Sequence, residues 1–182
     1  MASSAPGILV AMPSLEDPYF SKTVILLCTY NHEGAFGLVM NQPSSLQVRE
    51  VLTEDFQEHP AFQVPLLVGG PVQPESFWAI HTSDFKGEST SQISEELKLS
   101  SAPEVLRALI EERGPSCYHL GCGYSGWGPE QLDREIQEES WWLGPLDIPT
   151  ILDIDYAARW ENTLESLGFD PLMASLPSSG YA

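Results

Sequence analysis

The stretch TVILLCTYNHEGAFGLVMN, residues 23–41, decides the fold class of this chain. It contains two apolar runs rich in Val, Ile and Leu, and the turn residues Asn31 to Gly34 separate them. Apolar runs bounded by turn residues are typical of buried strands, and a short turn between two of them indicates a β-hairpin. We therefore expect antiparallel strands that follow each other directly in sequence.

Further apolar runs on both sides of this hairpin predict more strands. They cover residues 7–11, 64–68, 77–81, 117–121 and 148–152. Ile93, Leu97 and Leu99 have the same parity and indicate one amphipathic strand.

Helices are expected mainly in the second half of the chain. Ser101-Ala102-Pro103-Glu104 has the form of a capping box, and the helix that it begins should end at Gly114-Pro115. Two more helices are expected from Pro129 to about Glu139 and from Asp155 to Gly168. A short helix is also predicted after Ser45, which would cap it, through Leu52.

Strands that neighbour each other in sequence, with the helices inserted late, favour an α+β fold on a largely antiparallel or mixed sheet. A doubly wound parallel sheet is the alternative. At 182 residues the chain is long enough for one domain with a substantial core. We place this single domain at residues 1–170 and expect residues 171–182, rich in Pro, Ser and Gly, to be a loose tail.

The composition limits the classes of partner. The formal charge is −18, from 26 acidic and 8 basic residues, and the basic residues are spread singly. Such a chain repels nucleic acid and anionic lipid. No apolar stretch approaches the roughly 20 residues that span a bilayer, the amino end lacks the parts of a secretory signal, and the three cysteines lack disulfide spacing. We expect a cytoplasmic protein that contacts neither nucleic acid nor membrane.

Residues 121–129, GCGYSGWGP, are predicted to form a tightly constrained loop that leads into a helix. Residues 121–126 match the dinucleotide-binding pattern G-x-G-x-x-G, but Pro129 places the helix start beyond the third glycine. Ser125 resembles a nucleophile elbow, which needs glycine where this chain has Trp127. Both comparisons favour a structural glycine loop.

Cys117, His119 and Cys122 could supply metal ligands, with Cys28 or His32 as a fourth. Their spacing is not that of paired zinc knuckles, and small buried cysteines in a strand are the commoner arrangement. We therefore predict neither a metal site nor a cofactor.

Two glycine or amide segments, Asn41-Gln42-Pro43 and Gly69-Gly70-Pro71, follow predicted strands, where concave polar surfaces form. The alternative is that these glycines only allow positive φ in turns. Segments at opposite ends of the sheet would exclude a shared pocket. The candidate ligand-binding residues are Asn41, Gly69, Gly70, His81, Tyr124, Ser125 and Trp127.

Several segments together resemble the YqgE/AlgH family of bacterial proteins. They are 11–20, 23–28, 34–43, 69–72, 123–136, Trp141, Arg159-Trp160 and Leu167-Gly168, which cover nearly the whole chain. The resemblance implies a compact α+β domain with a bent sheet flanked by helices, and no settled activity. The family is often labelled a transcriptional regulator, but the acidity of this chain argues against DNA binding.

Two functional classes follow. The first is a non-enzymatic cytosolic regulator or adaptor that acts through protein contacts, with Trp141, Trp142 and Trp160 as anchors if exposed. The second is a small-molecule-binding protein or enzyme that uses the strand-end residues. We favour the first, because no nucleophile, base and orienting group can be assembled from the sequence.

Overall fold

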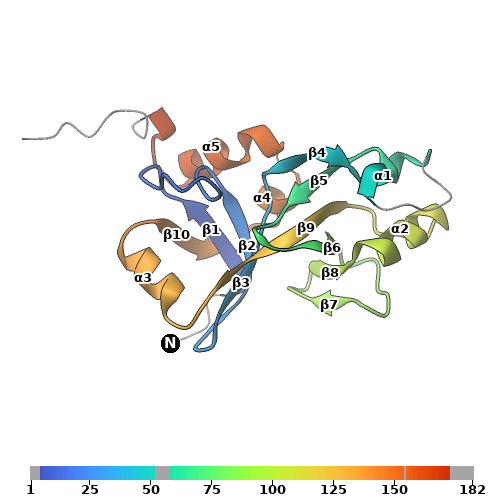
Figure 1. Ribbon diagram of the computed structural model, residues 1–182, viewed down its shortest axis with the longest axis horizontal. Coiled ribbons are helices and arrows are strands. Elements are labelled where there is room, and N and C mark those ends of the chain that lie inside the picture. Colours follow the sequence, from blue (N-terminus) through green and yellow to red (C-terminus); the bar gives the residue numbers. More distant parts are fainter. Residues whose placement is uncertain (1–4, 52–57, 154, 173–182) are drawn as a thin grey trace, which may run out of the picture.

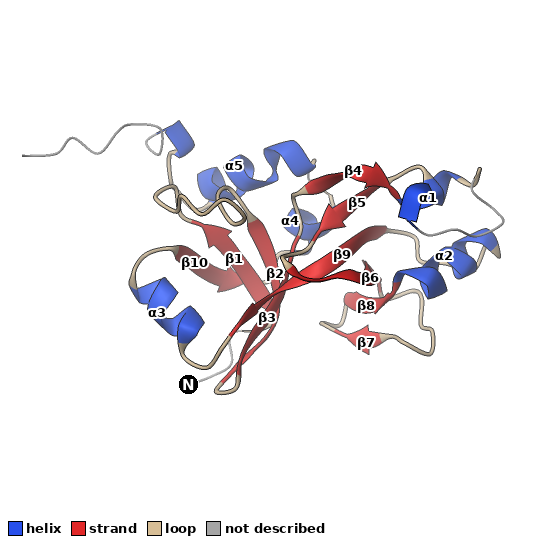
Figure 2. Ribbon diagram, in the orientation of Figure 1, coloured by secondary structure: helices blue, strands red, loops and turns tan. Residues whose placement is uncertain are grey.

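The structure is a computed structural model that describes residues 5–51, 58–153 and 155–172. As predicted, the fold is α+β: a curled, largely antiparallel sheet is flanked by helices (Figures 1 and 2). The strands are β1 Gly7–Ala11, β2 Val24–Asn31, β3 Gly34–Val39, β4 Pro43–Gln47, β5 Pro65–Val68, β6 Val72–Thr82, β7 Ser91–Gln92, β8 Leu97–Ser101, β9 Tyr118–Trp127 and β10 Trp141–Pro145. The helices are α1 Val48–Val51, the 3-10 helix η1 Pro60–Phe62, α2 Ala102–Ile110, α3 Gln131–Gln137, α4 Ile148–Leu152 and α5 Tyr156–Ser166.

The predicted hairpin is confirmed as β2 and β3, which pair antiparallel across the Asn31–Gly34 turn. β1 and β10 extend this part of the sheet to the order β10-β1-β2-β3-β9. Its central strands are buried on both faces, since Ile25 packs into one core cluster and the adjacent Leu26 into another. Burial on both faces explains why these strands have continuous apolar sequences.

The segment predicted as a glycine loop is part of a strand, so this prediction is wrong. β9 continues from Tyr118 to Trp127 and joins the two parts of the sheet (Figure 1). Its last residues pair with β3, and its first residues pair with β6 on one edge and β5 on the other. Of these pairings only the one with β5 is parallel, which makes the sheet mixed. Glycines normally weaken a strand, but here they serve close packing that is described below.

The second part of the sheet consists of the start of β9 with β4, β5, β6, β7 and β8. Helices cover both of its faces. Val105 and Leu106 of α2 pack with Ala79 and Leu120 on one face. On the other face, Ile151 of α4 and Leu164 of α5 share a core cluster with Ile80. The capping box predicted before α2 does not form, because the Ser101 side chain makes no capping hydrogen bond. The Glu104 carboxylate instead accepts hydrogen bonds from the backbone N–H groups of Glu88 and Ser89.

One predicted element differs in type from what the structure contains, and one strand was not predicted. Residues 148–152 form helix α4, not a strand, because Asp147 caps its Thr150 N–H and Pro149 lies in its first turn. The final strand is β10, which pairs with β1 and was not predicted.

The helix predicted after Ser45 begins later than expected. Ser45 lies within β4, which pairs with β5, and only Val48–Val51 are helical, while Leu52 lies outside the described residues. The predicted tail lies outside them as well from residue 173 onward.

Candidate functional site

The connection from β5 to β6 crosses over β9, and this crossing brings several candidate residues together. Val68 and Phe77 pair with opposite edges of β9 at Cys122, so the chain passes over β9 between them. A Cβ on Gly70 would lie 2.2 Å from backbone atoms of Tyr124, and Gly70 has a positive φ of 155°. Glycine is therefore required for the close approach of two backbones.

The other glycines of the crossing make room for the Trp78 indole. A Cβ on Gly121 would lie 2.3 Å from the indole ring, and one on Gly69 would lie 2.8 Å from it. The Trp78 Nε1–H donates to the Gly123 carbonyl at 2.7 Å. Two glycines of the segment that matches a dinucleotide motif thus serve one buried tryptophan: Gly121 makes room for its ring and Gly123 accepts its N–H.

The polar candidates near this crossing are engaged in internal hydrogen bonds. Ser125 Oγ donates to the Gly69 carbonyl at 3.0 Å, and Ser125 is fully buried. Asn41 Oδ1 accepts from the Val24 N–H, and Asn41 Nδ2 donates to the Lys22 carbonyl, both at 2.9 Å. Asn41 therefore fixes the path by which the chain enters β2.

His81 and Trp127 lie apart from this crossing. His81 pairs with Tyr118 at the start of β9, whereas Trp127 is the last residue of that strand. Trp127 packs against Trp141 and donates its indole N–H to Glu135 of α3. The structure thus places Asn41, Gly69, Gly70, Tyr124 and Ser125 near one another but not with His81 or Trp127. Ligand binding by these residues stays a prediction.

His81 belongs to a buried hydrogen-bonded pair. Its Nε2 lies 2.8 Å from Ser100 Oγ, and its Nδ1 lies 2.8 Å from the Thr82 carbonyl. Because a carbonyl only accepts, Nδ1 carries the proton and Nε2 accepts from the serine hydroxyl. This is the arrangement of a nucleophile and its base, but Ser100 is 3% exposed and His81 is 0% exposed. The pair is therefore closed to a substrate.

The cysteines and His119, considered above as metal ligands, have other surroundings. His119 Nδ1 lies 2.9 Å from the Tyr156 hydroxyl, and its Nε2 lies 3.1 Å from the Leu152 carbonyl. Burial raises the pKa of the Cys28 thiol to about 12 and also raises the pKa values of Cys117 and Cys122. Within the part of the chain that the structure describes, no three His, Cys, Asp or Glu side chains are arranged to hold a metal ion.

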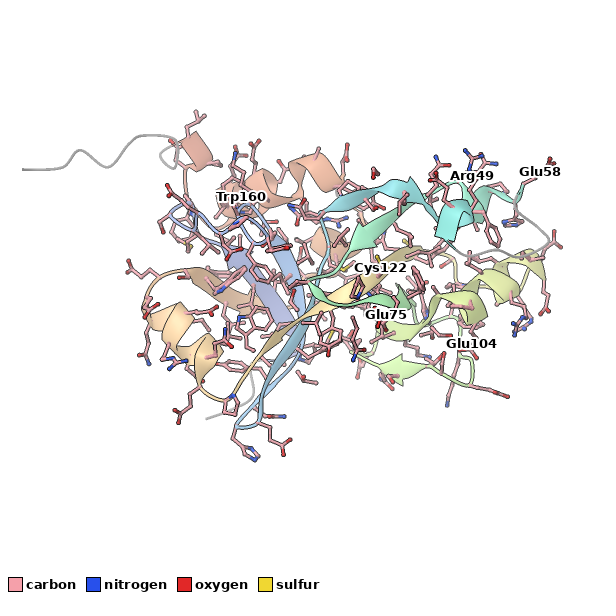
Figure 3. The ribbon with its side chains drawn as sticks, viewed as in Figure 1. Arg49, Glu58, Glu75, Glu104, Cys122 and Trp160 are labelled. Atoms are coloured by element: carbon pink, nitrogen blue, oxygen red, sulfur yellow. The ribbon has the colours of Figure 1, made fainter. Side chains whose placement is uncertain are left out.

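A cavity of about 300 Å³ lies elsewhere, between the loop that precedes β2 and helix α5. Figure 3 shows Trp160 on α5 beside this loop. The Trp160 Nε1–H donates to the Ala11 carbonyl at 2.9 Å, which holds the indole in place. The residues that line the cavity are Met12, Pro13, Leu15, Ser21, Lys22, Trp160, Glu161, Glu165, Asp170, Pro171 and Leu172. We refer to this feature as the α5 cavity.

The α5 cavity combines apolar walls with carboxylates. Glu161 and Glu165 are one turn apart on α5, and Asp170 follows the helix. Among the described residues that line it, Lys22 is the single cation, and its Nζ lies 5.8 Å from the centroid of the Trp160 ring. The arrangement suits a ligand with an apolar body and a positive charge.

The sequence alone did not reveal the α5 cavity. The sequence suggested Trp160 as an anchor for a protein partner if it were exposed, but it proves to be 4% exposed, as is Trp141. Trp142 is half-buried. The carboxylates at Glu161 and Glu165 follow helical spacing, but nothing local predicts that residues 12–22 pack beside them.

The protein is a small α+β protein with a curled sheet and flanking helices. Sequence comparison identifies the family to which it belongs. The sequence model of the AlgH-like family matches residues 8–172, and the chain belongs to this family. A UPF0301 protein of Shewanella loihica is 37% identical over 174 residues, covering 93% of this chain and 94% of the relative. A UPF0301 protein of Methylococcus capsulatus is 36% identical over 169 residues, covering 91% of this chain and 90% of the relative.

Two solved structures share the fold. The solution structure of the AlgH protein from Pseudomonas aeruginosa superimposes with a TM-score of 0.77 at 30% identity, covering 100% of this chain and 97% of that one. A crystal structure from Corynebacterium diphtheriae has a TM-score of 0.74 at 24% identity, covering 95% of this chain and 92% of that one. The family resemblance drawn from the sequence is confirmed, and the family is one of uncharacterised proteins.

Proposed function

We propose that this protein is a non-enzymatic cytoplasmic regulator or adaptor that acts by binding another protein at the rim of the α5 cavity. The observation that carries the proposal is the exposure of two large apolar side chains, one in the lining of the cavity and one in the loop that forms one of its walls. Leu172 lines the cavity and is 77% exposed, and Tyr19 is 67% exposed in the loop that forms one wall. Apolar side chains at the rim of a concave surface mark interaction sites.

Two further observations favour binding over catalysis, and two more concern the partner. The serine and histidine pair of Ser100 and His81 is buried. The polar candidates Asn41 and Ser125 are bonded within the fold. The net charge of −18 disfavours DNA as the partner. None of the helices in the described part of the chain has the length and apolar composition to cross a bilayer.

The test is photo-crosslinking in the cells from which the protein comes. A photoreactive phenylalanine analogue replaces Tyr19, and in a control chain it replaces Gln92, an exposed residue of β7 in the other part of the sheet. We expect a discrete protein adduct that forms under light from position 19 and is absent from position 92. Leu172→Asp should weaken that adduct without changing stability by more than about 0.5 kcal/mol. Equal adducts from both positions, or none from position 19, would contradict the proposal.

A small-molecule ligand is the second candidate, because a volume of about 300 Å³ is at the lower end for ligand cavities. Native mass spectrometry of protein purified from its own cells tests it. Extra mass that is lost on denaturation, and that Trp160→Ala abolishes, would support a bound compound. A bare mass would favour the protein partner.

A further inference from the structure

The Trp160 ring at the α5 cavity already has a cation over it. The Lys22 ammonium lies 5.8 Å from the ring centroid, within the range in which the ring quadrupole attracts a positive charge. The ring cannot turn away easily, since its Nε1–H is bonded to the Ala11 carbonyl. The part of the ring that lines the cavity is therefore held in a fixed orientation, although the Trp160 side chain as a whole is only 4% exposed.

The charges around the ring favour a second cation. Among the described residues of the lining, Glu161, Glu165 and Asp170 supply three carboxylates, against the one ammonium of Lys22. The cavity walls also include Met12, Leu15 and the prolines at 13 and 171, which suit the methylene stem of a long side chain. A long cationic side chain matches both parts of this lining.

Lys22 is placed so that its side chain can move without moving the loop. Its backbone carbonyl is held by Asn41 Nδ2 at 2.9 Å, and its φ is 57°. Its side chain is exposed. A stronger cation for the aromatic surface, such as a guanidinium, can therefore take its place while the backbone stays fixed.

We infer that the α5 cavity binds an arginine side chain of the protein partner, which stacks on Trp160, pairs with Glu161 and Glu165, and displaces the Lys22 ammonium. The inference rests on the proposed function and names the chemistry of that partner: a segment with arginine next to apolar residues. A second copy of this chain fits less well, because two chains of charge −18 repel each other.

The experiment is a titration of the full-length chain followed by ¹H–¹⁵N NMR. The probe is N-acetyl-arginine methylamide, and N-acetyl-citrulline methylamide is its neutral counterpart of nearly the same shape. We expect the arginine probe to shift the Trp160 indole resonance and the amides of Ser21 and Lys22. The citrulline probe should bind about tenfold more weakly.

Matched variants separate a built site from general attraction to an acidic protein. The double change Glu161→Gln with Glu165→Gln should weaken arginine binding about tenfold. Glu95→Gln with Glu138→Gln removes the same charge from exposed residues outside the cavity and should leave binding unchanged. Lys22→Met should strengthen binding, because the competing ammonium is gone.

The inference is overturned if citrulline binds as well as arginine, if Trp160 does not shift, or if the remote pair weakens binding as much as the cavity pair. Crosslinking separates this failure from failure of the proposed function. If the light-dependent adduct from position 19 persists at full yield in the Glu161→Gln, Glu165→Gln chain, the proposed protein partner stands and its arginine contact is rejected.

Discussion

Trp127 and Trp141 donate their indole N–H groups to one carboxylate oxygen, Oε2 of Glu135, each at 2.9 Å. Their strands, β9 and β10, are separated in the sheet by β1, β2 and β3. The two ring centroids are nevertheless 6.1 Å apart in an edge-to-face arrangement. The sheet therefore curls until its distant strands meet, and helix α3, which connects them, carries the acceptor that joins them.

We expect Glu135→Ala to lower the free energy of unfolding by about 2 kcal/mol, because two largely buried indole donors lose a charged acceptor. Glu135→Gln should cost about half as much, since the amide oxygen still accepts. Urea unfolding followed by circular dichroism measures both. Glu138→Gln, an exposed change on the C-terminal side of the same helix, should stay within about 0.5 kcal/mol of the native chain. Equal effects at Glu135 and Glu138 would refute the bridging role.

The glycines of the central motif should differ sharply in their tolerance of alanine. Gly70→Ala places a Cβ 2.2 Å from the Tyr124 backbone at a positive φ, and we expect a loss of about 3 kcal/mol or more. Gly126→Ala meets only the Tyr124 ring at 3.6 Å and should cost less than about 1 kcal/mol. Thermal unfolding of the two variants makes the comparison. A tolerated Gly70→Ala would mean that the chain does not cross β9 as described.

Gly121→Ala provides a further test, through the tryptophan that it contacts. Its Cβ would lie 2.3 Å from the Trp78 ring. The double variant with Trp78→Leu should lose less stability than the sum of the losses in the two single variants, because the smaller side chain removes that clash. Simple additivity would show that the Leu67 carbonyl, 2.8 Å from the same Cβ, sets the cost alone.

The sequence was sufficient to predict elements whose signal is local. The hairpin of β2 and β3 follows from two apolar runs and a turn, and α5 follows from Asp155 and an apolar face at helical spacing. The type of α4 depended on Asp147 and Pro149 outweighing an apolar run of strand-like length. There the capping residue was the better signal.

The features that the sequence did not predict depend on distant partners. Gly121 and Gly123 lie in a strand because of Trp78, which is more than forty positions earlier in the sequence. The Trp78 ring packs against Gly121, and its indole N–H donates to the Gly123 carbonyl. His81 and Trp127 were candidates for one site because the sequence does not reveal the length of β9. In the structure His81 lies beside the first residue of β9 and Trp127 is its last. The α5 cavity likewise requires that residues 12–22 meet α5, which no local pattern encodes.

Stability should fall as the pH falls below about 6.5. Burial lowers the pKa values of His81 and His119 from their ordinary 6.5. The unfolded chain therefore binds protons more readily than the folded one, so stability that is complete above pH 6.5 is lost as the pH falls towards the folded pKa values. His81→Gln should reduce the slope of unfolding free energy between neutral and mildly acidic pH. His32→Gln, at the exposed β2–β3 turn, is the control and should leave the slope unchanged. An unchanged slope in His81→Gln would show that His81 does not contribute.

The three thiols should be slow to react while the chain is folded. The thiolate is the reactive form, and burial raises the pKa of Cys28 to about 12 and also raises those of Cys117 and Cys122. We expect iodoacetamide at mildly alkaline pH to label Cys28 last, and all three cysteines to react much faster in concentrated urea. Mass spectrometry of peptides from partly labelled protein gives the order. Labelling of Cys28 at the same rate in folded and unfolded protein would contradict its packing, partly buried, against the core cluster beneath α4 and α5. Slow labelling of all three would argue that these cysteines fill space in the core and do not serve as nucleophiles or redox sensors.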